Sequence, residues 1–234
     1  MKNILITGGT SGIGNAILNE FHQNKWNVYF TFSKSKINAK KIENNYKNTQ
    51  SLNLDLNSKS SIDKIKKKIN NKLDCLILNA ADTVFVDKNN FKKLTPDLFE
   101  KYININLIAQ YRIIYNLLEI LNDNCNIILI SSIASKNGVG SNVAYSSSKA
   151  GLNNLAISLS KILGERIQIN CIAPGLMKTK FTSQFSYKYF KEYKLKTPSK
   201  KLTTPKNIAE IALSICLNFK NFTGQTIFVD GGSS

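Results

Sequence analysis

Two residues in the second half of the chain have the types and spacing for proton transfer. Tyr145 and Lys149 are four positions apart, which on an α-helix puts both side chains on one face, about 6 Å apart along the axis. A free phenol has a pKa of about 10, and a nearby ammonium lowers that pKa because it favours the phenolate. A tyrosine with a lowered pKa can act as general acid or general base near neutral pH. The pair therefore predicts a proton-transfer site on a helix.

Two adjacent serines precede this pair at the end of an apolar run. Ser132 lies thirteen residues before Tyr145, directly after Ser131. A hydroxyl at the end of a strand can hold a substrate oxygen through a hydrogen bond. Neighbouring side chains on a strand point to opposite faces, so only one of the two serines can face the site. Taken by themselves, the residues leave the choice between them open.

A glycine-rich segment near the start of the chain has the features of a phosphate-binding loop. Residues 7–14 read TGGTSGIG and lie between a predicted strand and a predicted helix. Glycines allow a tight turn in which backbone N–H groups and the positive end of the helix approach a pyrophosphate. The spacing differs from G-x-G-x-x-G and from the P-loop pattern, which disfavours FAD-type and NTP-hydrolysing sites. We expect phosphate contacts from Gly8, Thr10, Ser11, Gly12, Ile13 and Gly14.

These candidate residues need a scaffold, and the order of apolar runs predicts one. Segments rich in apolar residues, which we interpret as strands, recur at 4–7, 28–32, 73–78, 126–131, 168–172 and 225–229. Helical periodicity appears between them, at 15–23, 60–69 and 99–121. This alternation predicts a doubly wound, Rossmann-type α/β fold, with a parallel sheet and helices on both faces. We expect a single domain over residues 1–234, with ligands bound at the carboxyl ends of the strands.

The charge of the chain comes almost entirely from lysine. The formal net charge is +17, yet 30 of the 32 basic residues are lysines and the arginines are Arg112 and Arg166. Proteins that read nucleic acids more often gather basic residues in a stripe and use arginine for bidentate contacts. We therefore expect no nucleic-acid partner. Apolar residues make up 42% of the chain, which is typical of a soluble globular protein.

Other classes of site and location are disfavoured by what the sequence lacks. The four cysteines are far apart, each within an apolar run, so we expect reduced core residues and no metal site. His22 is the only histidine, which argues against a Ser-His-Asp hydrolase. No leader-like segment and no run of bilayer-spanning length is visible. We expect a cytoplasmic protein without a membrane partner.

Six motifs in a fixed order resemble the short-chain dehydrogenase/reductase family, in its small single-domain branch. Besides the glycine loop and the Tyr145–Lys149 pair, the resemblance rests on four further matches along the chain. They are Asp55 after the third strand, Asn79-Ala80-Ala81 after the fourth, Ser131-Ser132 after the fifth, and Asn170 with Pro174-Gly175 and Thr179. The chain ending, with Thr223-Gly224-Gln225 and Asp230-Gly231-Gly232, looks most like that of 3-oxoacyl-acyl-carrier-protein reductases.

The resemblance implies a role for each matching residue. Tyr145 would be the proton donor and acceptor, with its pKa lowered by Lys149 and the oxidised nicotinamide, and Lys149 would also bind the nicotinamide ribose. The family spacing favours Ser132 over Ser131 as the residue that holds the substrate oxygen. Of Asn104 and Asn106 it favours Asn106, which would hold a water that relays protons to Lys149. The implied cofactor contacts are Asp55 and Leu56 at the adenine, Asn79 and Ala80 along the adenosine ribose, and Pro174, Gly175 and Thr179 at the nicotinamide.

The residues after the second predicted strand predict which nicotinamide cofactor is preferred. Members of this family that use NAD usually have an acidic residue there, whereas this chain has Ser33 and Lys34. A hydroxyl and an ammonium suit a 2′-phosphate. We expect NADP(H) to be preferred, with NAD(H) possible.

The substrate and the assembly are less sharply predicted. By resemblance, residues 176–206 form a mobile lid, which is rich in aromatic residues and contains nine lysines. The segment 34–72 is equally basic, so the lysines do not identify the substrate. Three functions stay open: NADPH-dependent reduction of a 3-oxoacyl thioester or similar ketone, NAD(P)-linked oxidation of a sugar, polyol or other alcohol, and nucleotide binding without catalysis. By the same resemblance, the helices at 99–121 and 145–163 would pack against copies of themselves, in a homotetramer or homodimer.

Overall fold

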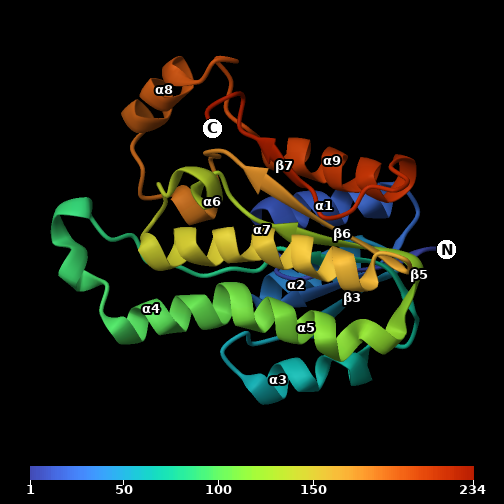
Figure 1. Cartoon of the computed structure of the whole chain (residues 1–234). Coiled ribbons are helices and arrows are strands. Elements are labelled where there is room, and N and C mark those ends of the chain that lie inside the picture. Colours follow the sequence, from blue (N-terminus) through green and yellow to red (C-terminus); the bar gives the residue numbers. More distant parts are fainter.

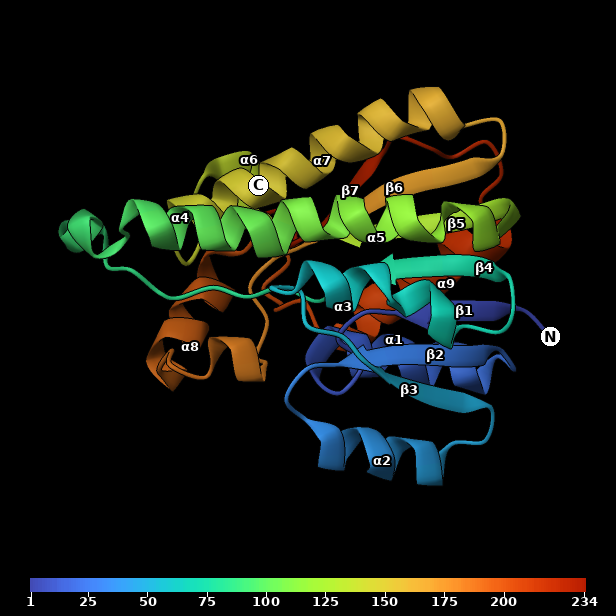
Figure 2. The same cartoon turned by 90° about the horizontal axis from the view of Figure 1, so that it is seen from below.

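The computed structural model describes residues 1–234, apart from the side chains of Lys88 and Lys180. Within this part of the chain, seven strands form one parallel sheet that lies between helices (Figure 1). The strand order is β3-β2-β1-β4-β5-β6-β7, which can be followed from the labels in Figure 2. The order reverses between β1 and β4, as in a doubly wound sheet. The predicted fold class is therefore confirmed. The strands are β1 (Asn3–Ile6), β2 (Asn27–Phe32), β3 (Thr49–Asn53), β4 (Leu73–Leu78), β5 (Leu121–Ile130), β6 (Ile167–Pro174) and β7 (Thr226–Val229).

Helices cover both faces of the sheet, and the strands supply apolar side chains to each face in turn. In β1, Ile4 and Ile6 join one buried cluster while Leu5 joins the other, as the two-residue period of a strand requires. The first cluster packs under α1 (Gly12–Gln23), α2 (Lys36–Asn45) and α9 (Pro205–Asn218). The second packs under α3 (Lys59–Asp63), α5 (Ala109–Leu117) and α7 (Val143–Leu163). Both faces are therefore dry, which explains why the central strands read as continuous apolar runs.

Three further helices lie at the carboxyl end of the strands. They are α4 (Pro96–Ile103), α6 (Ala134–Asn137) and α8 (Tyr187–Lys196). Figure 2 shows α8 standing beyond the carboxyl ends of β1 and β2, outside the two helix layers. The protein thus has most of its irregular structure at the edge of the sheet where a ligand is expected.

Three predicted elements differ from the structure. The predicted helix over 60–69 is divided into α3 and a 3₁₀ turn at Ile65–Lys68. The predicted helix over 99–121 is broken: after α4 come a π-helical turn at Asn104–Ile108, then α5, then a short 3₁₀ turn at Leu118–Ile120. Strand β5 starts at Leu121, earlier than the predicted 126. Periodicity also missed β3, because its sequence TQSLN buries only Leu52 and so lacks an apolar run.

Some features bear on the other predicted classes. Within the described residues, no helix is both long enough and apolar enough to cross a bilayer. Cys75, Cys125 and Cys171 are buried and Cys216 is partly exposed, all with free thiols. Among the residues that the structure describes, no three His, Cys, Asp or Glu side chains gather as metal ligands would.

Candidate active site

A cavity of about 420 Å³ opens at the carboxyl end of the sheet. Its lining begins at the loop after β1, crosses the ends of β4, β5 and β6, and reaches the start of α7. The segment that carries α8 completes the wall opposite Tyr145. One cavity therefore joins the predicted phosphate loop to the predicted proton-transfer pair. The predicted site residues along it are Gly8, Thr10, Ser11, Gly12, Ile13, Asn79, Ala80, Ser132, Tyr145, Lys149, Pro174, Gly175 and Thr179.

The glycine loop is shaped by close backbone approaches. Gly8 has a φ of 71°, a left-handed conformation that favours glycine. At Gly9 a Cβ would lie 2.7 Å from the Cβ of Phe30 in β2, so a side chain would push the loop off the sheet. Gly14 does not reach the cavity surface; it packs against the loop, where a Cβ would collide with the Gly8 carbonyl oxygen. These approaches bring the N-terminus of α1 to the cavity wall.

The first turn of α1 is built to face an anion. Ser11 is the N-cap and has extended backbone angles, yet its side chain caps none of the described N–H groups. Ser11, Gly12 and Ile13 all line the cavity, so the positive end of the helix is directed at it. Backbone N–H groups at such a helix start bind phosphate.

Thr7 braces the loop, although the sequence patterns did not single it out. Its fully buried hydroxyl accepts hydrogen bonds from the backbone N–H groups of Asn79, at 2.9 Å, and Ala80, at 3.0 Å. The Asn79 side chain in turn donates to the carbonyl oxygens of Thr7 and Gly8. The ends of β1 and β4 are thus tied together at the sheet position where the strand order reverses. A buried threonine directly before a glycine loop is the signal that could have identified this brace.

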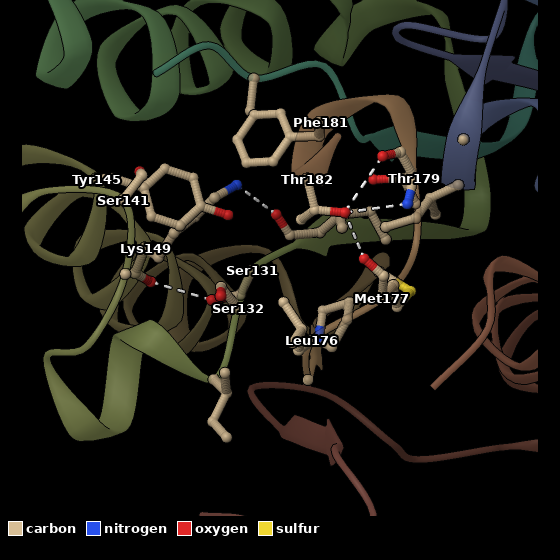
Figure 3. A pocket seen from close by; sticks show the side chains of 18 of the residues that line it. Ser131, Ser132, Ser141, Tyr145, Lys149, Leu176, Met177, Thr179, Phe181 and Thr182 are labelled. Atoms are coloured by element: carbon tan, nitrogen blue, oxygen red, sulfur yellow. Dashed lines mark hydrogen bonds between the residues drawn. The ribbon is translucent and has the colours of Figure 1, made fainter. Parts of the chain in front are cut away.

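Tyr145, Lys149 and Ser132 meet in the cavity, as Figure 3 shows. Asn142 caps α7 by accepting a 2.8 Å hydrogen bond from the Tyr145 N–H, which sets the first turn of the helix. One turn further on, the buried Lys149 ammonium donates a 2.7 Å hydrogen bond to the Ile130 carbonyl oxygen and lies 5.6 Å from the centre of the Tyr145 ring. The Ser132 side chain lies close enough to the Tyr145 phenol to lower its pKa.

The neighbouring Ser131 points elsewhere. Its hydroxyl donates to the Lys149 carbonyl oxygen at 3.2 Å and so anchors α7 to the end of β5. This contact uses the backbone of the helix and leaves the hydroxyl of Ser132 as the one beside Tyr145. The two adjacent serines therefore have different environments, as the alternation of side chains at a strand end requires.

Burial dominates the electrostatics of the pair. It raises the pKa of the Tyr145 phenol, while the nearby Ser132 hydroxyl acts in the opposite direction by favouring the phenolate. Burial also lowers the pKa of Lys149 to about 8, because the charged form loses its hydration. The expected lowering of the Tyr145 pKa is therefore not what the protein alone produces. In the protein by itself the phenol stays protonated at neutral pH, ready to donate a proton.

Comparison with known proteins identifies the family. A family model described as "Enoyl-(Acyl carrier protein) reductase" matches residues 8–234. The 3-oxoacyl-[acyl-carrier-protein] reductase FabG of Buchnera aphidicola is 33% identical, over 99% of this chain and 96% of that protein. The chain belongs to the short-chain dehydrogenase/reductase family. It is an NAD(P)-dependent oxidoreductase that acts on carbonyl or alcohol groups.

Other short-chain dehydrogenases/reductases are similar to this protein over nearly the whole chain. FabG of Aquifex aeolicus is 29% identical, covering 99% of this chain and 96% of its own. Among solved structures, a Pseudomonas aeruginosa RhlG/NADP active-site complex is 25% identical with a TM-score of 0.89, covering 99% of this chain and 95% of its own. BdcA in complex with NADPH is 26% identical with a TM-score of 0.88, covering 99% and 93%.

Asn106, predicted to relay protons in this short-chain dehydrogenase/reductase, is buried in the π-helical turn. Its amide accepts a 2.9 Å hydrogen bond from the Asp82 N–H and donates one of 2.8 Å to the Asp82 carbonyl oxygen. It does not reach the cavity surface among the described lining residues. The amide thus holds the segment that follows Asn79 and Ala80, and the water relay to Lys149 stays a prediction.

Besides Gly14, four predicted cofactor residues of this short-chain dehydrogenase/reductase lie outside the described cavity lining: Ser33, Lys34, Asp55 and Leu56. They follow β2 and β3, whose carboxyl ends lie at the same sheet edge as the glycine loop. Ser33 and Lys34 are exposed. The Asp55 carboxylate accepts hydrogen bonds from the Asn57 backbone and side chain, at 3.0 and 3.1 Å. Contacts of these residues with an adenosine stay predictions.

Proposed function

We propose that this protein reduces a ketone, a 3-oxoacyl thioester or similar carbonyl, to a secondary alcohol with NADPH, using Tyr145 as general acid. The observation that carries the proposal is the group of Tyr145, Ser132 and Lys149 in the same cavity as the glycine loop. The FabG relatives, named as 3-oxoacyl-[acyl-carrier-protein] reductases, support the thioester as substrate.

The residues present fit a nicotinamide cofactor. The positive end of α1 suits its pyrophosphate, and the cavity runs from there to Lys149, whose ammonium can bind ribose hydroxyls. Pro174, Gly175 and Thr179 line the cavity at the end of β6 and would hold the nicotinamide end. When bound, the reduced cofactor supplies the hydride to the carbonyl carbon.

Each catalytic residue then has a distinct task. The Ser132 hydroxyl donates a hydrogen bond to the carbonyl oxygen, and Tyr145 transfers its proton to that oxygen as negative charge develops there. The nearby Lys149 ammonium stabilises the resulting phenolate. The Ile130 carbonyl fixes the lysine, so its ammonium needs little reorganisation as the charge forms.

We infer NADPH as the preferred cofactor from Ser33 and Lys34 at the end of β2, where a carboxylate would repel a 2′-phosphate. The NADP and NADPH complexes of the two structural relatives support this preference. We also propose that residues 176–206 act as a lid that closes over a bound substrate, since residues 176–193 contribute to the cavity wall. A homodimer or homotetramer, formed through α4, α5 and α7, completes the proposal.

The test is a substrate screen with NADPH and with NADH, in which the loss of absorbance of the reduced cofactor measures turnover. We expect turnover of acetoacetyl thioesters, faster with NADPH, and a loss of at least about 100-fold in kcat for Tyr145→Phe. Cofactor binding to Tyr145→Phe, measured by fluorescence, is expected to persist and serves as the control for folding.

Each other result of the screen would support a different function. Turnover of sugars or polyols without ketone reduction favours the alcohol dehydrogenase. Reduction of a crotonyl thioester, but not of ketones, points to an enoyl reductase, the activity in the family model's description. NADPH binding with no turnover on any substrate indicates a nucleotide-binding protein.

A further inference from the structure

Aromatic side chains surround the part of the cavity next to Tyr145. The ring of Phe181 lies 5.9 Å from that of Tyr145, and Phe85 lies 6.3 Å from Phe181. Phe185 continues the wall, 5.1 Å from Phe85 and stacked on Tyr189 at 4.5 Å. Phe85, Phe181, Phe185 and Tyr189 all line the cavity. We call these four residues the aromatic wall.

One side of the aromatic wall is fixed by the same residue that positions the catalytic tyrosine. Phe85 lies on the loop after β4, between Val84 and Val86. The Asn142 side chain donates a 2.6 Å hydrogen bond to the Val84 carbonyl oxygen, while its own oxygen accepts from the Tyr145 N–H. The Val86 N–H donates to the Ser141 carbonyl oxygen at 2.9 Å. Phe85 is thereby held at a set place relative to the Tyr145 backbone.

The other side comes from the predicted lid. Phe181 lies in a short 3₁₀ turn held by the Thr182 hydroxyl, which donates to the Met177 carbonyl oxygen at 2.6 Å (Figure 3). Phe185 precedes α8, and Phe190 of that helix is buried behind it with the rings 6.2 Å apart. The lid therefore presents aromatic rings toward Tyr145.

Much aromatic surface in this wall is open to solvent. Phe85 is 37% exposed, Phe181 41% and Tyr189 43%. Apolar surface gathered around a cavity is most stable when an apolar ligand covers it. A polyol in the same place would lose hydrogen bonds to water without finding partners on the rings. The wall therefore discriminates between the substrates that the catalytic residues alone would allow.

Resting on the proposed function, we propose that the substrate carbonyl bears an extended apolar group, an acyl chain or ring, that binds against the aromatic wall, along Phe85 and Phe185. The aromatic wall then determines specificity: it recognises the part of the substrate beyond the reacting carbon. The reactive oxygen is held by Ser132 and Tyr145, and the apolar group lies along the rings. The enzyme then selects substrates by the length of their apolar chain and not by the arrangement of their hydroxyl groups.

The test is a series of 3-oxoacyl N-acetylcysteamine thioesters of four to ten carbons with NADPH. Burial of one methylene favours binding by about fourfold when it is complete. We expect kcat/KM to rise at least about tenfold from the acetoacetyl to the 3-oxooctanoyl compound, chiefly through KM. In Phe185→Ala and Phe181→Ala we expect the ratio of the two kcat/KM values to fall at least about fivefold. Phe185→Leu, which keeps an apolar side chain, should restore part of the ratio.

Phe219→Ala is the matched control. Phe219 is also a partly exposed aromatic residue, but it follows α9 at the opposite end of the sheet and contacts Phe222. Its substitution should leave the chain-length ratio unchanged. Thermal unfolding and NADPH binding of each variant show whether it is folded.

The outcomes separate this inference from the proposed function. Ketone reduction with kcat/KM independent of chain length, or with a ratio that Phe185→Ala and Phe181→Ala do not change, overturns the aromatic wall as a specificity site while leaving the reductase intact. Absence of all ketone reduction overturns the proposed function itself. A rise with chain length that both lid variants remove supports the inference.

Discussion

At the scale of single residues, Lys149 shows how the site balances stability against chemistry. The side chain is 3% exposed, and burial lowers its pKa to about 8 from an ordinary value of 10.5. Below pH 8 the folded protein must keep an ammonium in a poorly hydrated place, which costs about 3 kcal/mol. The charge is retained where it can stabilise a phenolate. Strongly shifted pKa values of this kind are concentrated at functional sites.

This gives a pH-dependent prediction for both activity and stability. The ammonium is lost as pH rises through about 8, so we expect ketone reduction to decline above that pH. Between pH 8 and about 10.4 the unfolded state binds more protons at this lysine than the folded state, so the unfolding free energy rises with pH. Relative to Lys149→Met, wild type should gain about 2 kcal/mol between pH 7.5 and 9.5, measured by urea unfolding. Equal pH dependence in both proteins would show that Lys149 titrates normally.

The sequence predicted that Tyr145 and Lys149 lie close together, but it did not predict how buried they are. The four-residue spacing of Tyr145 and Lys149 placed them on one helix face, because helix geometry is local. It could not reveal how deeply the helix start is buried, and burial is what raises the pKa of Tyr145. Thr7 was missed for a similar reason: its role depends on β4, more than seventy residues away along the chain.

At the scale of elements, the π-helical turn at Asn104–Ile108 links the helix layer to the site. π-turns within α-helices often occur at functional sites. Here the turn buries Asn106 and lets its amide bind both polar backbone groups of Asp82. Gln110, one turn later, donates to the Ala80 carbonyl oxygen at 3.1 Å. The side-chain amides of Asn106 and Gln110 therefore hold the loop after β4 against the π-helical turn and α5.

Substitution of Asn106 should weaken both the fold and the cavity. Asn106→Ala leaves the Asp82 N–H and carbonyl without these partners, and we expect a loss of about 2 to 4 kcal/mol in unfolding free energy. NADPH affinity should also fall, because Ala80 and Ala81 line the cavity. Urea unfolding and cofactor titration measure the two effects.

Asn104→Ala is the matched control, since Asn104 begins the same turn and is less buried. It should cost less than about 1 kcal/mol. Equal losses for the two variants would contradict the role assigned to the Asn106 amide.

Two elements, β3 and the broken helix at 99–121, show why sequence patterns predicted only part of the fold. Apolar runs revealed the buried central strands, but β3 lies at the sheet edge and buries little, so it gave no run. The buried residues of the segment 99–121 keep spacings of three and four through the π-turn, so the apolar pattern gave no sign of the break. The break depends on the contact between Asn106 and Asp82, which a local pattern does not contain.

At the scale of the whole molecule, the outer faces of the π-helical turn, α5 and α7 carry apolar surface. A shallow hollow between them is lined by Leu107, Ile108, Tyr111, Gly151, Asn154, Leu155 and Ser158. The π-helical turn and α7 pack closely there: a Cβ at Gly151 would lie 2.7 Å from a Leu107 methyl group. Ile108 and Tyr111 are exposed beside it, with Tyr115 one turn further along α5. Exposed apolar patches of this kind are typical of protein interfaces.

We therefore expect wild type to sediment as a dimer or tetramer in the micromolar range, and Tyr111→Glu to shift the mass toward the monomer. A buried carboxylate in the interface would lose its hydration without gaining a partner. Because each chain has a net charge of +17, association should also strengthen as salt screens the repulsion between copies. Ile37→Glu, at an exposed apolar position on α2, is the control and should leave the mass unchanged. A monomeric wild type at high salt, or an equal effect of both variants, would show that this helix face is not the interface.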